Sequence, residues 1–131
     1  CLFSGTIRDN IAFARPADDE LIMQSARAAC AEDFISRLPD GLDTPIGENG
    51  AGLSEGQAQR IAVARALYSG ACFLLLDEAT SALDGETESR LLKNIAALDG
   101  KTVLIVTHRP AALEICSRKF TLKDGVLDER N

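Results

Sequence analysis

The stretch Cys72-Phe-Leu-Leu-Leu-Asp77-Glu78-Ala-Thr-Ser-Ala-Leu-Asp84 decides how the rest of this chain is interpreted. Five apolar residues are followed at once by two carboxylates and a short polar loop that ends in a third. The unbroken apolar run predicts a strand buried on both faces, because a strand with one face in water would alternate apolar and polar residues. We therefore expect a parallel strand that carries chemistry at its carboxyl end.

The two adjacent carboxylates suit two different tasks. Asp77 can hold a hydrated Mg²⁺, since this hard cation takes oxygen ligands and usually only one or two carboxylates. Glu78, one residue on, is free to handle a proton. A strand that ends in nothing more than a solvated acidic turn would carry the same residues, so this alternative stays open at this point.

Length and charge exclude several classes of protein. A chain of 131 residues with 46% hydrophobic content suits one domain with a real core. No apolar run approaches the ~18 residues that a membrane-spanning helix needs. A net charge of -6 offers no basic surface for nucleic acid or anionic lipid.

The cysteines lie far apart and form no CxxC pair; they are Cys1, Cys30, Cys72 and Cys116. Because Cys72 lies in the apolar run, we expect it to be buried. The spacing indicates reduced, structural thiols in a cytosolic protein, with neither a metal site nor a disulfide framework. No signal peptide is visible. The chain starts at Cys1 without a methionine and within an apparent loop, so we expect it to be part of a longer polypeptide.

Two amphipathic segments precede the apolar strand. Asp18-Asp19-Glu20 supply an N-cap and an acidic first turn for a helix whose apolar residues recur as far as Leu38. A break in this helix is expected near residues 31–32. A second helix begins at Ser54, where Ser54 and Gln57 form a capping box ahead of an apolar stripe.

The start of this second helix also suits an anion. Free N–H groups and the positive end of the helix dipole make a ready site for phosphate. Gly56 in the first turn keeps side-chain bulk away from a ligand. Ser54 could instead be no more than a cap, although capping alone does not require a glycine at position 56.

A second apolar run, Thr102 to Thr107, predicts another buried strand. The helix expected after Asp84 makes strand, helix and strand a right-handed unit with parallel strands. The only histidine, His108, follows the second strand and is expected at the same sheet edge as Asp77 and Glu78. A short helix and a hairpin with an Asp-Gly turn finish the chain.

With these residues in place, the sequence resembles the C-terminal two-thirds or so of the nucleotide-binding domain of an ATP-binding cassette (ABC) transporter. Leu53-Ser-Glu-Gly-Gln57 resembles the signature motif, with a glutamate where the usual second-position glycine stands. Cys72 to Ala79 resembles Walker B, Ser81-Ala-Leu-Asp84 the D-loop, and His108 the switch histidine of the H-loop. The resemblance covers essentially all 131 residues, with the motifs in the order of the family.

Two further stretches resemble exporter-type members. Phe3 to Ile11 is similar to the segment before the helical subdomain, and Thr44 to Gly50 to the segment before the signature, which touches the transmembrane domain in that group. The resemblance implies an α/β fold: a partial P-loop NTPase (RecA-like) core with a parallel sheet plus an α-helical subdomain. It implies a single, N-terminally truncated ABC ATPase domain over residues 1–131, with the helical subdomain at about 14–68 and the catalytic core at about 71–131.

The resemblance also implies a mechanism with ATP as substrate and Mg²⁺ as metal. Asp77 would bind Mg²⁺ through water, and Glu78 would be the general base that polarises the attacking water. His108 would contact the γ-phosphate and hold the reacting geometry.

A second group of residues is implied to act across a dimer. Ser54, Gly56 and Gln57 would bind the γ-phosphate of ATP held by a second nucleotide-binding domain in a head-to-tail dimer. Asp84 would pass along that interface. The other implied partner is the transmembrane domain of the same transporter, at the cytoplasmic face of the cell (inner) membrane, and no nucleic acid is expected.

The sequence contains no GxxxxGK[ST] phosphate-binding loop, so we expect this chain to be inactive by itself. The parent protein would be the ATP-hydrolysing subunit of an exporter-type ABC transporter. Two other classes stay open, namely a non-transport ABC ATPase of the chromosome or DNA-repair type and a non-catalytic interaction fragment.

Overall fold

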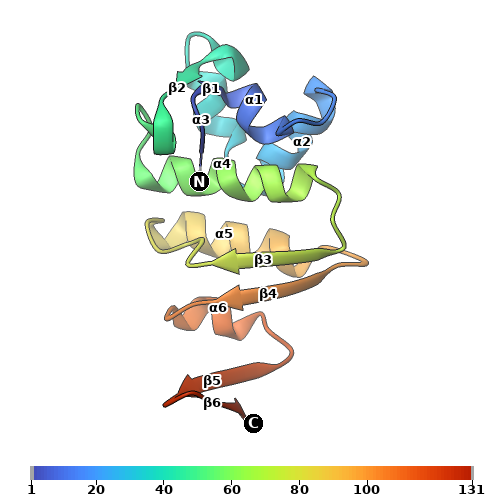
Figure 1. Cartoon of the computed structure of the whole chain (residues 1–131), viewed down its shortest axis with the longest axis vertical. Helices are drawn as coiled ribbons and strands as arrows, with labels where there is room; N and C mark the ends of the chain where they lie inside the picture. Colours follow the sequence, from blue (N-terminus) through green and yellow to red (C-terminus); the bar gives the residue numbers. More distant parts are fainter. Residues whose placement is uncertain (1, 131) are drawn as a thin grey trace.

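The computed structural model describes residues 2–130 of the chain. Helices α1 to α4 lie at one end, the strands β3 and β4 with helix α5 lie in the middle, and the β5–β6 hairpin lies at the other end (Figure 1). In chain order the elements are β1 Gly5–Thr6, α1 Ile7–Ala12, α2 Asp19–Ala28, α3 Glu32–Arg37, the 3₁₀ turn η1 Gly41–Asp43, β2 Pro45–Ile46, the 3₁₀ turn η2 Glu48–Gly50, α4 Glu55–Tyr68, β3 Phe73–Asp77, α5 Gly85–Ala96, β4 Thr102–Val106, α6 Pro110–Glu114, β5 Lys119–Lys123 and β6 Val126–Arg130.

Helix α4 is the centre of the helical end and contacts both α1 and α2. The predicted capping box opens it: the Ser54 Oγ accepts from the Gln57 N–H over 3.1 Å, and the Gln57 side chain accepts from the Ser54 N–H over 3.0 Å. Of the predicted apolar stripe, Ile61 and Ala64 are fully buried, whereas Leu67 and Tyr68 are only partly buried. The capping box therefore sets where α4 starts, and the apolar residues that follow it set which face is buried.

The predicted break in the first amphipathic segment is confirmed. Residues 29–31 separate α2 from α3, and Cys30 among them has a φ of 59°. A residue in the left-handed region ends a helix, because the backbone can no longer continue the right-handed ladder. Asp18 caps α2 by accepting from the N–H groups of Glu20 and Leu21.

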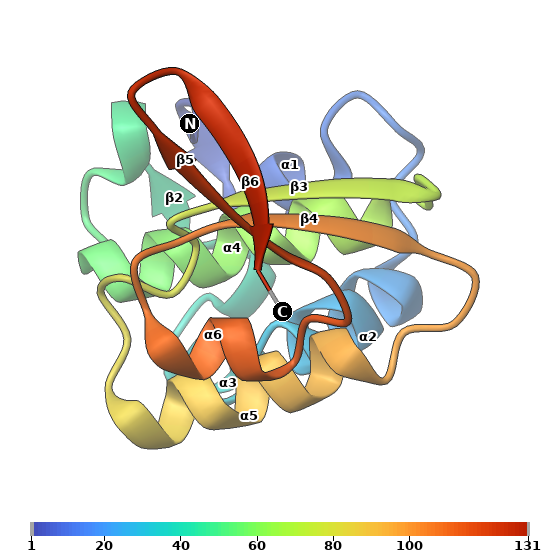
Figure 2. The same ribbon diagram turned by 90° about the horizontal axis from the view of Figure 1, so that it is seen from below.

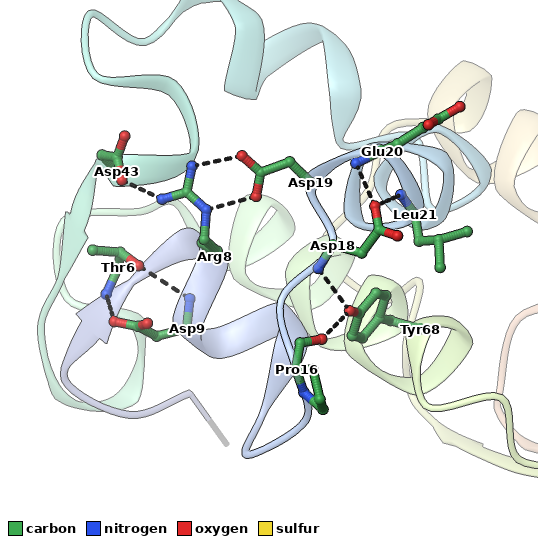
Figure 3. Close-up of polar contacts among 10 residues, drawn as sticks. All are labelled: Thr6, Arg8, Asp9, Pro16, Asp18, Asp19, Glu20, Leu21, Asp43 and Tyr68. Carbon is green, nitrogen blue, oxygen red and sulfur yellow. Dashed lines mark hydrogen bonds and ion pairs between the residues drawn. The ribbon is translucent and has the colours of Figure 1, made fainter.

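A polar cluster fastens the loop before α2 to its neighbours (Figure 3). Arg8 of α1 pairs with Asp19 of α2, with 2.8 Å between Arg8 Nε and Asp19 Oδ1, and also with Asp43 of η1. The Tyr68 hydroxyl, at the end of α4, donates to the Pro16 carbonyl over 2.5 Å. Segments that are distant in sequence are thus joined at the surface of the helical end.

Strands β3 and β4 are parallel, as predicted, with Phe73 opposite Thr102 and Asp77 opposite Val106. Helix α5 connects them and lies beside α6 (Figure 2). Leu76 of β3 belongs to the same buried cluster as residues of α4 and α5. The register brings the carboxyl ends of both strands to one edge of the sheet.

The prediction that both strands are buried on both faces is wrong. In β3, Leu74 and Leu76 are buried, but Phe73 is 56% and Leu75 58% exposed. Strand β4 alternates between exposed and partly buried residues. The exposed large residues of the pair are Phe73, Leu75, Leu104 and Val106. The elements formed by residues 2–130 cover only one face of this pair, so alternate residues of an apolar run face solvent. Cys72, which was expected to be buried, is exposed as well.

The C-terminal hairpin is confirmed. Strands β5 and β6 are antiparallel, and the turn residues Asp124 and Gly125 have φ values of 51° and 79°. Two positive φ angles are what a two-residue hairpin turn of this kind requires. Within residues 2–130, no helix has both the length and the apolar content to cross a membrane.

Candidate functional site

The carboxyl ends of β3 and β4 bring the two predicted catalytic side chains together. His108 Nε2 lies 3.7 Å from Glu78 Oε1. The Glu78 N–H donates to the Val106 carbonyl over 2.9 Å, which extends the parallel ladder one residue beyond β3. The His108 side chain is 96% exposed and the Glu78 side chain 38%. Both groups can therefore reach a ligand at this edge of the sheet.

The backbone of Glu78 is strained. Its φ of 51° lies in the left-handed region, which costs a residue with a Cβ roughly 1–2 kcal/mol. Such conformations persist where surrounding contacts determine the backbone, and they cluster at functional positions. The chain thus leaves the strand direction at the residue that carries the candidate base.

Asp77 ends β3 and is exposed. A hydrated Mg²⁺ needs only one or two protein carboxylates, because water and phosphate supply its other oxygens. Within the described residues, His, Cys, Asp and Glu side chains form no group of three or more that could hold a metal ion by themselves. Asp77 is the exposed carboxylate at the end of β3 that could take part in holding such an ion.

A shallow groove of about 200 Å³ runs between α4 and β3, beside the two carboxylates. Gln59 of α4 lines it together with Asp77 and Glu78. Its amide holds the loop that follows Glu78: Nε2 donates to the Glu78 carbonyl over 3.2 Å and to Ser81 Oγ over 2.7 Å. Its Oε1 accepts from the Ala82 N–H over 3.2 Å. Sequence reasoning missed Gln59, because its partners lie 19 or more positions away in the sequence and no local pattern marks it.

Gly56 has a packing role that the sequence did not indicate. A Cβ at this position would lie 2.9 Å from the Ala82 carbonyl oxygen and 3.3 Å from Leu83 Cδ2. The start of α4 therefore rests on the loop of Ala82, and a larger residue would push the two apart. The glycine makes room for this loop of its own chain, whereas the sequence suggested room for a ligand.

The remaining predicted nucleotide contacts lie elsewhere. Asp84 caps α5, and its two carboxylate oxygens accept from the Thr87 N–H over 2.8 Å and from the Thr87 hydroxyl over 3.0 Å. These bonds hold the pKa of Asp84 below its usual range. Ser54 and Gln57 bond to each other. In the part of the chain that the structure describes, the site edge unites Glu78 and His108, and neither side chain bonds to Ser54, Gln57 or Asp84.

Glu88 of α5 is a second residue that sequence reasoning missed. Its side chain is only 7% exposed and accepts from Arg109 Nε over 2.8 Å. The Arg109 guanidinium lowers the pKa of Glu88; burial raises it, and a hydrogen bond with Thr80 lowers it further. Arg109 directly follows His108, and Thr80 stands two residues after Glu78. The buried Glu88 carboxylate therefore contacts both segments that carry the candidate catalytic residues.

The two stretches that resemble exporter-type members lie side by side. Gly5 pairs with Ile46 and Thr6 with Pro45 in a short antiparallel ladder. The Ile7 N–H adds a bond to the Thr44 carbonyl over 3.1 Å. Two separate sequence signals therefore belong to one surface segment.

Residues 1–81 match the family model described as ABC transporter. The chain belongs to the ABC transporter family. It is 47% identical over 130 residues to the cyclolysin secretion/processing ATP-binding protein CyaB of Bordetella pertussis, a match that covers 98% of this chain and 18% of that protein. It is 44% identical over 131 residues to antigen peptide transporter 2 of Rattus norvegicus, with 99% of this chain and 18% of that protein covered.

The fold also matches that of a bacterial Atm1-family ABC exporter with ATP bound, at a TM-score of 0.88 and 40% identity. The match covers 95% of this chain and 22% of that chain. It confirms the predicted class, a partial P-loop NTPase core with a parallel sheet and an α-helical subdomain. This ABC chain spans about a fifth of the length of the relatives it matches.

Proposed function

We propose that the parent protein is the ATP-binding and ATP-hydrolysing subunit of an ABC exporter at the cytoplasmic face of the cell membrane. The observation that carries this proposal is the 3.7 Å approach of His108 Nε2 to Glu78 Oε1 at the carboxyl edge of β3 and β4. Family membership supports ATP as the substrate. Relatives named for secretion, peptide transport and export favour a transporter over an ATPase of the chromosome or DNA-repair type.

Glu78 is the general base in this mechanism. Its partly exposed carboxylate accepts a proton from the water that attacks the γ-phosphorus. His108, exposed at the same edge, donates a hydrogen bond to a γ-phosphate oxygen and keeps the phosphate in line with that water. Asp77 would hold Mg²⁺ through water, and the bound ion supplies charge neutralisation at the phosphates.

The start of α4 acts on a second subunit. Ser54, Gly56 and Gln57 would bind the γ-phosphate of ATP that a partner nucleotide-binding domain holds in a head-to-tail dimer, and Asp84 would lie along the interface. Two features support this part: the positive end of the α4 dipole lies at this start, and Ser54 is exposed there.

The proposed division of labour follows the two ends of Figure 1. A helical subdomain at about residues 14–68 carries the signature, and a catalytic core at about residues 71–131 carries Walker B, the D-loop and the H-loop. The transmembrane domain of the transporter would contact the helical end through Thr44 to Gly50, the segment that pairs with β1.

Glu78→Gln in the full-length parent protein tests the proposal. The variant should still bind ATP, but its turnover should fall by roughly 10²–10⁴, because an amide cannot accept the proton. Glu86→Gln, which changes an exposed acid in the first turn of α5, is the matched control and should turn over like the wild type. Near-normal turnover of Glu78→Gln would move the base role to His108 and contradict the assignment.

A further inference from the structure

Two parts of the chain with different proposed tasks meet at one amide. The signature motif opens α4, and the loop from Glu78 to Asp84 carries the candidate base and the D-loop. Gln59 belongs to α4 and directs its side chain to that loop. Nothing in the proposed hydrolysis uses Gln59, so its contacts require an explanation of their own.

The amide of Gln59 is bonded at both ends. Its nitrogen donates to the Glu78 carbonyl over 3.2 Å and to Ser81 Oγ over 2.7 Å, and its oxygen accepts from the Ala82 N–H over 3.2 Å. Three bonds to three residues of one loop fix both the rotamer of the glutamine and the separation of Glu78 from Ala82. The packing of Gly56 on the Ala82 carbonyl adds a second contact between the same two elements.

Two backbone bonds form within the described loop, and the Glu78 N–H also donates to the Val106 carbonyl over 2.9 Å. The Ser81 N–H donates to the Glu78 carbonyl over a long 3.3 Å, and the Leu83 N–H donates to the Thr80 carbonyl over 3.1 Å. Glu78 also has the positive φ, a conformation that requires support from surrounding contacts. One of the Gln59 bonds ends on the carbonyl of this strained residue itself.

We propose that Gln59 is a positioning residue for Glu78. By holding the Glu78 carbonyl and the Ala82 N–H, it keeps the backbone in the conformation that directs the Glu78 carboxylate toward His108. The inference rests on the proposed function, because the direction of this carboxylate matters for turnover only if Glu78 is the base. The same bonds connect α4, whose start would face a partner's nucleotide, to the loop of Glu78, which would act on the chain's own nucleotide.

The test is Gln59→Met in the full-length parent protein, since methionine has a similar length and packs similarly but makes none of the three bonds. We expect kcat to fall roughly tenfold, because small misplacements of a catalytic group are costly, while KM for ATP changes less than about twofold. The melting temperature should stay close to that of the wild type. Gln24→Met, at an exposed position of α2, is the matched control and should leave kcat unchanged.

A second measurement does not depend on activity. Hydrogen exchange of the peptide that spans residues 78–84, recorded without nucleotide, should be faster in Gln59→Met, because the Ala82 N–H loses its acceptor. Gln24→Met should leave this exchange unchanged. The exchange rate therefore reports whether the three bonds hold the loop in the parent protein.

The outcomes separate the inference from the function on which it rests. Unchanged kcat in Gln59→Met, whether or not loop exchange rises, overturns the positioning role, and so does a rise in KM with kcat intact. Loss of kcat together with a large fall in melting temperature would make Gln59 a residue of general stability and also overturn it. The proposed function itself is tested by the wild-type parent protein. If that protein has no ATPase activity, or has activity that Glu78→Gln does not abolish, the proposed function is overturned as well.

Discussion

Arg109 Nε donates to Glu88 Oε2 over 2.8 Å, and this carboxylate on α5 is nearly enclosed. Arg109 stands next to His108, and Thr80, which also bonds to Glu88, stands two residues past Glu78. The segments that carry the candidate base and the candidate phosphate ligand therefore share one anchor. Loss of the Glu88 carboxylate should therefore lower the stability of the fold more than it changes any single catalytic group.

Glu88→Gln should lower the free energy of unfolding by roughly 2 kcal/mol at pH 7, because Arg109 loses its charge partner. The loss is smaller than for a fully enclosed pair, since the Arg109 side chain is 37% exposed. Urea unfolding of the chain at micromolar concentration measures it. Glu86→Gln, an exposed acid on the same helix, is the control and should change the value by less than about 0.5 kcal/mol.

The same pair predicts a pH dependence. Arg109 lowers the pKa of Glu88 relative to its unfolded value of about 4.3. The ionised carboxylate therefore stabilises the fold fully above pH ~4.3, and this contribution disappears as pH falls through the lower pKa of the folded state. The difference between wild type and Glu88→Gln should shrink at acidic pH. A difference that stays constant down to pH 2 would contradict this account.

The chain by itself should not hydrolyse ATP. Its sequence has no GxxxxGK[ST] loop, and in P-loop enzymes that loop and its lysine position the β- and γ-phosphates. A Mg²⁺-dependent ATPase assay on the purified chain should give only the background rate. A rate that vanishes in Glu78→Gln would show that this chain completes a hydrolytic site alone.

Ser54 and Glu78 should act on the same ATP only when they come from different subunits. Ser54→Arg puts a bulky cation where a partner's γ-phosphate would dock, and it leaves Asp77 and Glu78 of its own chain intact. In a homodimer of the full-length parent, a mixed dimer of Ser54→Arg and Glu78→Gln subunits should therefore collect both lesions in one composite site. The second site should remain unmutated.

The measurement for this prediction is the ATPase rate of the mixed dimer, isolated by two different tags. It should exceed the rate of either mutant homodimer, because each homodimer carries a lesion in every site. Single-turnover ATP cleavage in the same mixed dimer covers the case in which both sites must fire together. A mixed dimer that cleaves no more ATP than the homodimers in either assay would mean that the two residues do not act in trans.

The exposed face of β3 and β4 should make the chain self-associate. Four large apolar side chains lie about half exposed on this pair, and strand edges with free N–H and C=O groups invite pairing between chains. Light scattering at high concentration should detect species larger than the monomer. Leu75→Lys combined with Leu104→Lys should restore the monomer, whereas Leu21→Lys, at a similarly exposed position of α2, should not. A monodisperse wild-type monomer would count against this expectation.

The features that could be predicted from the sequence depend on neighbouring residues or on a general rule of topology. The Ser54–Gln57 cap and the Asp124-Gly125 turn each need only a few consecutive residues. The approach of His108 to Glu78 follows from the rule that parallel strands end at one edge of a sheet. Such relationships need no knowledge of how distant elements pack.

The features that could not be predicted depend on packing. An apolar run such as the one in β3 shows which residues a strand could bury, but not whether another element covers each face. The prediction that Phe73, Leu75 and Cys72 are buried was therefore wrong. Gln59 and Glu88 escaped notice because their partners lie 19 and 21 positions away in the sequence. No local pattern distinguishes them from other polar residues on helix surfaces.

The positive φ of Glu78 sets stability against turnover at a single position. Glycine would adopt this backbone without a steric penalty, but it would bring no carboxylate to the edge of the sheet. A protein selected only for its folded state would be expected to drift toward glycine or asparagine here. Stabilising substitutions gathered without an activity screen should therefore accumulate at residue 78, and each of them would leave an ATPase domain that folds better and works worse.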